Sequence, residues 1–115
     1  MQIPQQALML RIYIGEDDKH GNRPLHEAIV LEARSRHLAG ATVLRGIEGF
    51  GAKSHLHTAR ILQLSSDLPL LIEIVDTEER VQSFLPLLDE MVAEGLVTIE
   101  PVDVLLYRAA SPDKK

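Results

Sequence analysis

The chain has 115 residues, enough for one domain of ordinary size, and 45% of them are hydrophobic, enough for a packed core. Its 17 acidic and 12 basic residues give a net charge of -5, which argues against nucleic-acid binding because that function needs a basic surface. There is no cysteine, which excludes disulfides, thiol catalysis and thiolate metal sites. No apolar run reaches the roughly 20 residues of a membrane span, and the first residues lack a signal-peptide pattern. We therefore expect a single cytoplasmic domain over residues 1–115, not inserted in a membrane, with loose tails at 1–6 and 109–115.

Apolar and polar residues alternate over residues 8–14, which predicts a strand with one fully apolar face. A charged loop follows at 15–22. Its three acids offer oxygen ligands to a hard cation, but the loop lacks the spacing of a calcium loop, so a solvated turn is the simpler interpretation. Apolar residues then recur at helical spacing over 24–39. Pro24 suits the first turn of this predicted helix, and Gly40 suits its C-terminal cap.

Glycines mark the next predicted strand, residues 41–50, and the start of a polar loop, residues 51–58. They lie at positions 46, 49 and 51. Because glycine has no Cβ, these positions either let a ligand approach the backbone closely or form a bulge that turns the strand into the loop. Residues 57–64 look extended again and are able to pair with the strand 41–50 as a hairpin. We interpret the loop between them as the working part of the molecule.

A nearly continuous apolar run at residues 70–75 predicts a buried central strand. Glu73 is the charged residue within this run, and Arg11 is the charged residue within the strand 8–14. If the two strands are neighbours in the sheet, these opposite charges are expected to pair across it.

A second helix is predicted after this strand, because apolar residues recur at helical spacing over 81–92. Asp76 is the expected N-cap, with Glu79 completing a capping box. Gly95 is expected to end the helix. Pro86 removes one backbone hydrogen bond inside the helix, which predicts a kink there.

The last predicted strand has two parts, 96–100 and 102–107, separated by Pro101, which is typical of an edge strand or a bulge. The order strand, helix, strand, strand, helix, strand predicts an α+β fold, the ferredoxin-like βαββαβ sandwich, with both helices on one face of an antiparallel sheet. The other face would expose an apolar patch, which indicates that an oligomer covers it. The residues expected on that face are Met9, Tyr13, Leu71 and Val75.

Five stretches of the chain resemble a PII-like family, the domain-of-unknown-function family 190. They are Leu10–Glu16, Gly40–Gly46, Gly49–Gly51, Leu68–Asp76 and Glu94–Thr98. The chain is more distantly similar to the PII nitrogen-regulatory signalling proteins, in which a Gly-Phe-Gly sequence closes the second strand and opens the mobile T-loop. Here that sequence is Gly49, Phe50 and Gly51, so the loop that corresponds is 51–58.

The resemblance implies a homotrimer whose open sheet faces pack inward, with adenine-nucleotide pockets in the clefts between subunits. It also implies that the loop 51–58 docks on a regulated partner protein, often a membrane transporter. The residues assigned to the ligand are Gly49, Phe50 and Gly51, with the cations Arg45, Lys53 and Arg108. The chain departs from PII proteins at 93–97, where it has one glycine and no lysine in place of a phosphate-binding loop. We interpret the protein as a regulator that senses a small adenine nucleotide or a related metabolite.

Two further functions stay open. His55 and His57 lie on one face of an extended segment and are able to share a divalent metal with a carboxylate, so the alternative is a trimeric metal-binding protein. The third interpretation is a structural adaptor with no small ligand. An enzyme is disfavoured, because the chain has no nucleophile elbow and no phosphate-loop motif.

Overall fold

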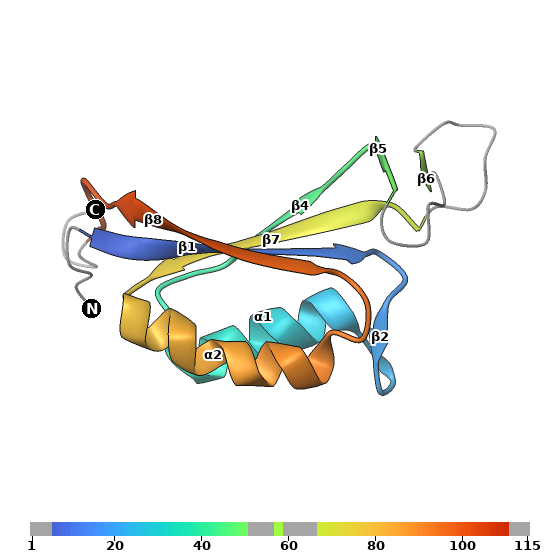
Figure 1. Cartoon of the computed structure of the whole chain (residues 1–115), viewed down its shortest axis with the longest axis horizontal. Coiled ribbons are helices and arrows are strands. Elements are labelled where there is room, and N and C mark those ends of the chain that lie inside the picture. Colours follow the sequence, from blue (N-terminus) through green and yellow to red (C-terminus); the bar gives the residue numbers. More distant parts are fainter. Residues whose placement is uncertain (1–5, 51–56, 59–66, 111–115) are drawn as a thin grey trace.

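The computed structural model describes residues 6–50, 57–58 and 67–110, and its main feature is one four-stranded sheet covered on one face by two helices (Figure 1). The strands are antiparallel and follow the order β4-β7-β1-β8 across the sheet. They are β1 (Gln6–Gly15), β4 (Thr42–Arg45), β7 (Pro69–Asp76) and β8 (Leu96–Asp103), and the helices are α1 (Leu25–Ser35) and α2 (Glu78–Met91). The predicted α+β ferredoxin-like fold is confirmed.

Two pairs of short strands lie beside the main sheet. One, β2 (Lys19–His20) with β3 (Arg23–Pro24), lies in the stretch before α1 that the sequence predicts to be a simple loop. The other, β5 (Glu48–Gly49) with β6 (His57–Thr58), confirms part of the predicted hairpin. The rest of that hairpin, residues 59–64, lies outside the described residues. The predicted single strand 41–50 is wrong, because the chain turns after β4 and starts the separate strand β5.

The hydrophobic core lies between the sheet and the helices. Alternate side chains of β1 and β7 point towards the helices, because successive residues of a strand face opposite sides. The buried side chains at this interface include Leu10, Ile12, Ile72 and Ile74 from the sheet and Ile29, Val81 and Phe84 from the helices. Burying each such side chain stabilises the fold by about 1.5–3 kcal/mol relative to leaving it exposed. Among the described residues, no helix is both long enough and apolar enough to cross a membrane.

The register of β1 and β7 places Arg11 opposite Glu73. Arg11 Nε donates a hydrogen bond to Glu73 Oε2 over 3.1 Å, so the predicted pair across the sheet is confirmed. The same register aligns the apolar residues that share the face without helices. These are Met9 with Val75 and Tyr13 with Leu71. The predicted open apolar face is therefore confirmed for the single chain.

Helix α1 ends well before the predicted residue 39. His37 has a φ of 62°, the left-handed conformation that often closes a helix. The N–H of His37 donates to Arg34 O, and the N–H of Leu38 donates to Ala33 O, which are the two bonds of a Schellman motif. The prediction that Gly40 caps this helix is wrong, because His37 takes the position at which glycine is usual.

Helix α2 begins one residue later than predicted. Its N-cap is Thr77, whose Oγ1 accepts a hydrogen bond from the N–H of Arg80 over 3.2 Å. Asp76 is fully buried, and its carboxylate accepts from the N–H of Thr77 at 2.6 Å and from the N–H of Ala39 at 2.8 Å. The predicted capping box of Asp76 and Glu79 is therefore wrong. The Asp76 carboxylate instead binds the backbone of Ala39, in the segment that follows α1, to the end of β7.

Prolines are tolerated at both predicted positions. Helix α2 continues through Pro86 to Met91, and a kink there stays a prediction. Strand β8 continues through Pro101 and is the outer strand of the sheet, which confirms the predicted edge position. The predicted second part of that strand, 102–107, is too long, because β8 ends at Asp103. At the other end of the chain, β1 already includes Gln6, so the predicted loose tail is too long as well.

Candidate functional site

Gly46 and Gly49 fold around the ring of Pro69, the first residue of β7. A Cβ added at Gly46 would lie 2.8 Å from Pro69 Cγ, and one added at Gly49 would lie 3.1 Å from the same atom. The N–H of Gly46 also donates to Pro69 O over 2.7 Å. Of the two interpretations left open for these glycines, the structure favours the turn at the strand end, because the proline ring fills the space beside them. Gly51 lies outside the described residues.

Two apolar side chains project from this turn. Ile47 is 78% exposed and Phe50, which directly follows β5, is 71% exposed. An aromatic ring this exposed has room for a flat ligand or a second protein chain to pack on it. The assignment of Phe50 to a ligand stays a prediction, and the structure places its exposed side chain directly after β5.

Arg45, the last residue of β4, is paired with Glu16 from the loop after β1. Arg45 Nη2 donates a hydrogen bond to Glu16 Oε2. The Arg45 side chain is 59% exposed and the Glu16 side chain 26% exposed, so the carboxylate lies on the inner side of the pair. A cation that the sequence assigns to a ligand is thus already bound to an acid of the same chain.

The loop after β1 is also tied to the start of β7. The N–H of Glu16 donates to Leu68 O over 2.8 Å, and the N–H of Asp17 donates to Asp67 Oδ1 over 2.7 Å. A Cβ added at Gly15 would lie 2.6 Å from that same Asp67 oxygen, so glycine permits the close approach. The loop after β1 therefore contacts both the end of β4, through Arg45, and the residues just before β7.

Neither Glu16 nor Asp67 is among the site residues predicted from the sequence. The signal for their proximity was present, because Glu16 follows one predicted strand and Asp67 precedes another, and these ends meet when the strands are antiparallel neighbours. That signal does not identify Arg45 as the partner of Glu16, since the position of β4 in the sheet is not a local property of the sequence.

The acids of this loop do not gather around an ion. In the part of the chain that the structure describes, no group of three or more His, Asp or Glu side chains is placed to hold a metal. Asp18, for example, accepts a hydrogen bond from the N–H of Gly15 at 2.9 Å. Of the predicted metal ligands, His55 lies outside the described residues, and His57 is described only by its backbone in β6. Lys53, assigned to the ligand, also lies outside.

Arg108 lies far from Arg45. Strand β8 ends at the opposite end of the sheet from β5 and β6 (Figure 1). The hydroxyl of Tyr107 donates to Ala39 O over 2.6 Å, and the N–H of Ala39 is bound by Asp76, the last residue of β7. Arg45 lies opposite Leu70, near the start of β7. The stretch of β7 from Leu70 to Asp76, about 20 Å of extended chain, therefore separates Arg45 from the region of Tyr107. Within one chain the two arginines do not meet.

The sheet face without helices carries a continuous apolar row. The registers place Leu44 opposite Leu71, Leu71 opposite Tyr13, and Tyr13 opposite Leu96, so each strand of the sheet contributes one side chain. Tyr13, Leu44 and Leu96 are 39%, 48% and 56% exposed in the single chain. A contiguous apolar surface of this kind is typical of a contact between proteins.

Beside this row, Arg11 binds two acids at once. Its Nε contacts Glu73 over 3.1 Å, and its Nη1 contacts Glu100 of β8. The hydrogen bond to Glu73 raises the pKa of Arg11 above its ordinary value, although burial acts in the opposite direction. A guanidinium is protonated throughout the physiological range in any case. If a partner chain covers this face, Arg11 has to keep its contacts with Glu73 and Glu100, because an unpaired charge buried there would be costly.

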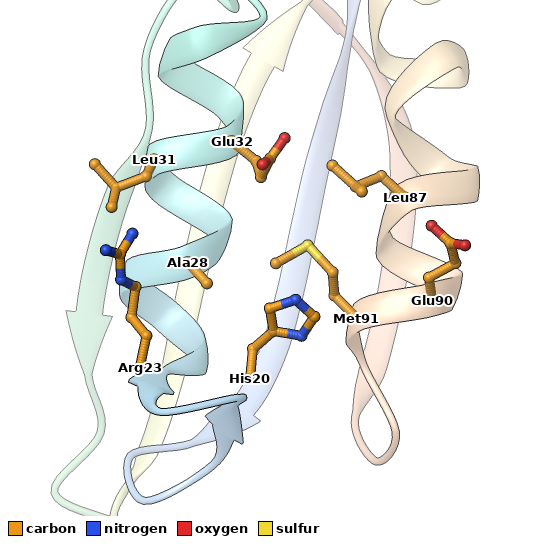
Figure 2. Close-up of a pocket in the computed structure, with 8 residues that line it drawn as sticks. All are labelled: His20, Arg23, Ala28, Leu31, Glu32, Leu87, Glu90 and Met91. Atoms are coloured by element: carbon orange, nitrogen blue, oxygen red, sulfur yellow. The ribbon is translucent and has the colours of Figure 1, made fainter.

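A groove of about 500 Å³ lies between α1 and α2, on the helical side of the molecule (Figure 2). His20 points from β2 into the space between the helices, towards Met91 of α2 (Figure 2). Glu32 and Glu90 flank the groove from the two helices, and Glu32 already accepts a hydrogen bond from Arg36 at 3.4 Å. This groove is separate from the glycine turn. None of the side chains that line it is among the site residues predicted from the sequence.

Solved structures with the same arrangement of elements include PII-like proteins. A PII-like signalling protein of Thermus thermophilus superimposes with a TM-score of 0.64 at 17% identity, covering 90% of this chain and 93% of that chain. CPII, a nitrogen regulatory PII-like protein of Thiomonas intermedia K12 in complex with ADP, AMP and bicarbonate, superimposes with a TM-score of 0.60 at 18% identity, covering 86% and 88%. The fold of this chain is therefore PII-like.

Sequence relatives then define the family. The DUF190 family model, whose description is Uncharacterized ACR, matches residues 7–104. A UPF0166 protein of Aquifex aeolicus (strain VF5) is 36% identical over 99 residues, which cover 84% of this chain and 91% of that protein. The chain belongs to the DUF190 family, so the resemblance noted in the sequence is confirmed.

Proposed function

We propose that the protein is a non-enzymatic, cytoplasmic regulatory subunit that binds an adenine nucleotide, or a related metabolite, in the clefts between the copies of a homotrimer. The observation that carries this proposal is the separation of the candidate ligand residues. Arg45 and Phe50 lie at one end of the sheet and Arg108 lies at the other, about 20 Å away. Only a second copy is able to bring one end beside the other.

The open sheet face supplies the contact that such an assembly needs. Its apolar row runs across all the strands and is half exposed in the single chain. Removing apolar surface from water is the main favourable contribution to most protein–protein association. The ligand class is supported by the nucleotides bound to CPII of Thiomonas intermedia K12, which has the same fold.

In this proposal each side chain has a defined task. The exposed ring of Phe50 stacks on the adenine base. Arg45, together with Arg108 of a second copy, donates to phosphate oxygens, for which the planar guanidinium is suited. Lys53 adds a further cation, and the backbone N–H groups of Gly49 and Gly51 are offered as donors to the phosphate oxygens.

Ligand binding regulates through the loop 51–58. The loop follows directly from the strand that carries the ligand residues, so a bound nucleotide favours one loop conformation over others. A ligand shifts such an equilibrium by its difference in affinity for the two states. The favoured conformation then binds, or releases, a regulated partner protein such as a membrane transporter.

The experiment combines native mass spectrometry with calorimetric titration of ADP and AMP. Leu44→Glu places a charge in the open face and is expected to give monomers and to abolish nucleotide binding at the same time. Leu31→Glu is the matched control, because Leu31 is similarly exposed (40% against 48%) but lies on α1. This control variant is expected to remain trimeric and to bind nucleotide normally.

Two results would contradict the proposal. A monomeric Leu44→Glu protein that binds ADP as tightly as the wild type would exclude a cleft between copies. A trimer that binds no nucleotide would exclude the ligand. If a divalent metal alone then raises the melting temperature, and replacing His55 and His57 abolishes that rise, the metal-binding alternative takes its place.

A further inference from the structure

Arg45 is held by Glu16, and this contact bears on which anions the site accepts. We propose that Glu16 sets the anion specificity of the site by competing with the ligand for the Arg45 guanidinium. A ligand binds Arg45 only when it displaces the Glu16 carboxylate, which favours a nucleoside diphosphate over an anion with a single charge. The inference rests on the proposed function, because it concerns the same site.

The backbone fixes Glu16 where it meets Arg45. The N–H of Glu16 donates to Leu68 O at 2.8 Å, and the N–H of the next residue, Asp17, donates to Asp67 Oδ1 at 2.7 Å. Both bonds hold the main chain of the loop against the start of β7. An acid on an anchored backbone loses less conformational freedom when its side chain pairs, so it competes more strongly than an acid on a mobile segment.

The pair joins two separate elements of the fold, unlike the ion pairs within one helix of the chain. Glu32 and Arg36 are one turn apart at the end of α1, with side chains 43% and 48% exposed. Such pairs contribute little and are weakened by salt. Glu16 and Arg45 are 29 positions apart in sequence, and their contact joins the loop after β1 to the end of β4. It is therefore a tertiary contact beside the candidate site.

The charge of the incoming anion decides the competition. A monoanion carries the same charge as the Glu16 carboxylate and gains no Coulomb energy by replacing it. The terminal phosphate of a nucleotide carries nearly two charges near neutral pH and offers two oxygens to the arginine fork. Asp17 and Asp67 add further negative charge around the loop, which repels weakly held anions. The arrangement selects ligands with a multiply charged phosphate.

The test compares two adenine nucleotides that differ in charge. The dissociation constants of ADP and of the singly charged cyclic AMP are measured by calorimetry for the wild type and for Glu16→Gln. We expect the substitution to strengthen binding of both, roughly threefold to tenfold for cyclic AMP and less for ADP, because Arg45 is then available to a monoanion. The preference for ADP over cyclic AMP becomes smaller.

Matched variants separate this effect from a general change in charge. Glu48→Gln removes an exposed acid from β5, on the same side of the molecule, and is expected to change both constants less than twofold. Glu16→Asp keeps the charge but retracts the carboxylate by one methylene, and is expected to act in the same direction as Glu16→Gln. In an Arg45→Gln background, Glu16→Gln is expected to change neither constant.

The outcomes distinguish the inference from the proposed function. If ADP binds the wild type and Glu16→Gln behaves like Glu48→Gln, the inference is overturned and the proposed function stands. Weaker ADP binding by Glu16→Gln and Glu16→Asp also overturns the inference, because Glu16 would then support the ligand rather than compete with it. If neither nucleotide binds any of these proteins, the proposed function falls and the inference falls with it.

Discussion

Arg11 and Glu73 face each other at the centre of the open sheet face, where Arg11 Nε lies 3.1 Å from Glu73 Oε2. In the single chain their side chains are 33% and 29% exposed, and solvent screening keeps the contribution of a pair at that exposure small. In the proposed trimer another copy buries this face, which would change the balance. Removing one partner of a buried pair costs about 3–5 kcal/mol, because the other charge is left uncompensated.

The first prediction follows from that difference. Arg11→Met is expected to weaken the oligomer strongly, because Glu73 and Glu100 would be buried together without a cation. The fold of the single chain is expected to survive. Native mass spectrometry over a concentration series measures the dissociation. Arg34→Met on the exposed side of α1 is the control, and equal assembly of the two variants would mean that the open face is not the interface.

The pH dependence of the Arg11 contribution is the second prediction. The hydrogen bond to Glu73 raises the pKa of Arg11 above its ordinary value. A base whose pKa is raised on folding contributes stability that is fully present below the unfolded pKa and is lost only as pH rises through the folded pKa. The difference in unfolding free energy between wild type and Arg11→Met should therefore be constant between about pH 6 and pH 9. Urea titrations at several pH values check this, and a sloping difference would contradict it.

The third prediction concerns the packing of glycine against proline. Gly46→Ala would place a Cβ 2.8 Å from Pro69 Cγ and 3.3 Å from Pro69 O, so we expect a loss of about 1–3 kcal/mol in unfolding free energy. Adding Pro69→Ala should recover part of that loss, because the ring carbon is removed. Gly40→Ala is the control, since no atom lies within 4 Å of its added Cβ. Equal effects at positions 46 and 40 would rule out the packing explanation.

Asp76 is the subject of the fourth prediction. Its fully buried carboxylate accepts from the N–H groups of Thr77 and Ala39, which join α1's exit to the start of α2. Asp76→Ala leaves both donors without this acceptor, so we expect a loss of about 2–4 kcal/mol in unfolding free energy. Asp89→Ala on the exposed face of α2 is the control and should change stability by less than about 0.5 kcal/mol. Chemical denaturation measures both.

The fifth prediction is a gain in stability. His37 closes α1 with a φ of 62°, a conformation that glycine adopts without a steric penalty. His37→Gly should stabilise the protein by about 0.5–1 kcal/mol. The same change inside the helix, Arg34→Gly, should destabilise it by a similar amount, because glycine is a poor helix former. Opposite shifts in melting temperature would support this account of the helix end, and shifts of the same sign would refute it.

Local patterns predicted much of the fold because each was repeated along a whole element. The alternation over 8–14 and the apolar run over 70–75 placed the two central strands, and the pairing of Arg11 with Glu73 followed because each is the charged exception in its apolar stretch. Pro101 likewise indicated an edge strand, since proline has no backbone N–H to donate to a neighbouring strand.

The element ends were harder to predict, because several residues there satisfy the same local rule. Asp76 and Thr77 are both good N-cap residues for α2, and Thr77 is the one that caps it. The Asp76 carboxylate instead accepts a hydrogen bond from the N–H of Ala39, which is distant in sequence. Glycine is the usual residue at a helix end, which made Gly40 the expected cap. Helix α1 instead ends at His37, because the N–H of Leu38 donates a hydrogen bond to Ala33 O and closes the last turn there.

By itself, the sequence determined the two helices, the two central strands with the faces they bury, the open apolar face and the family, because those depend on residue types repeated at fixed spacing. Only the tertiary structure decided that Pro69 fills the space beside Gly46, that Glu16 holds Arg45, and that Arg108 lies at the far end of the sheet. These contacts join residues that are distant in sequence. Their geometry comes from how the strands lie beside one another, which no local pattern of residues contains.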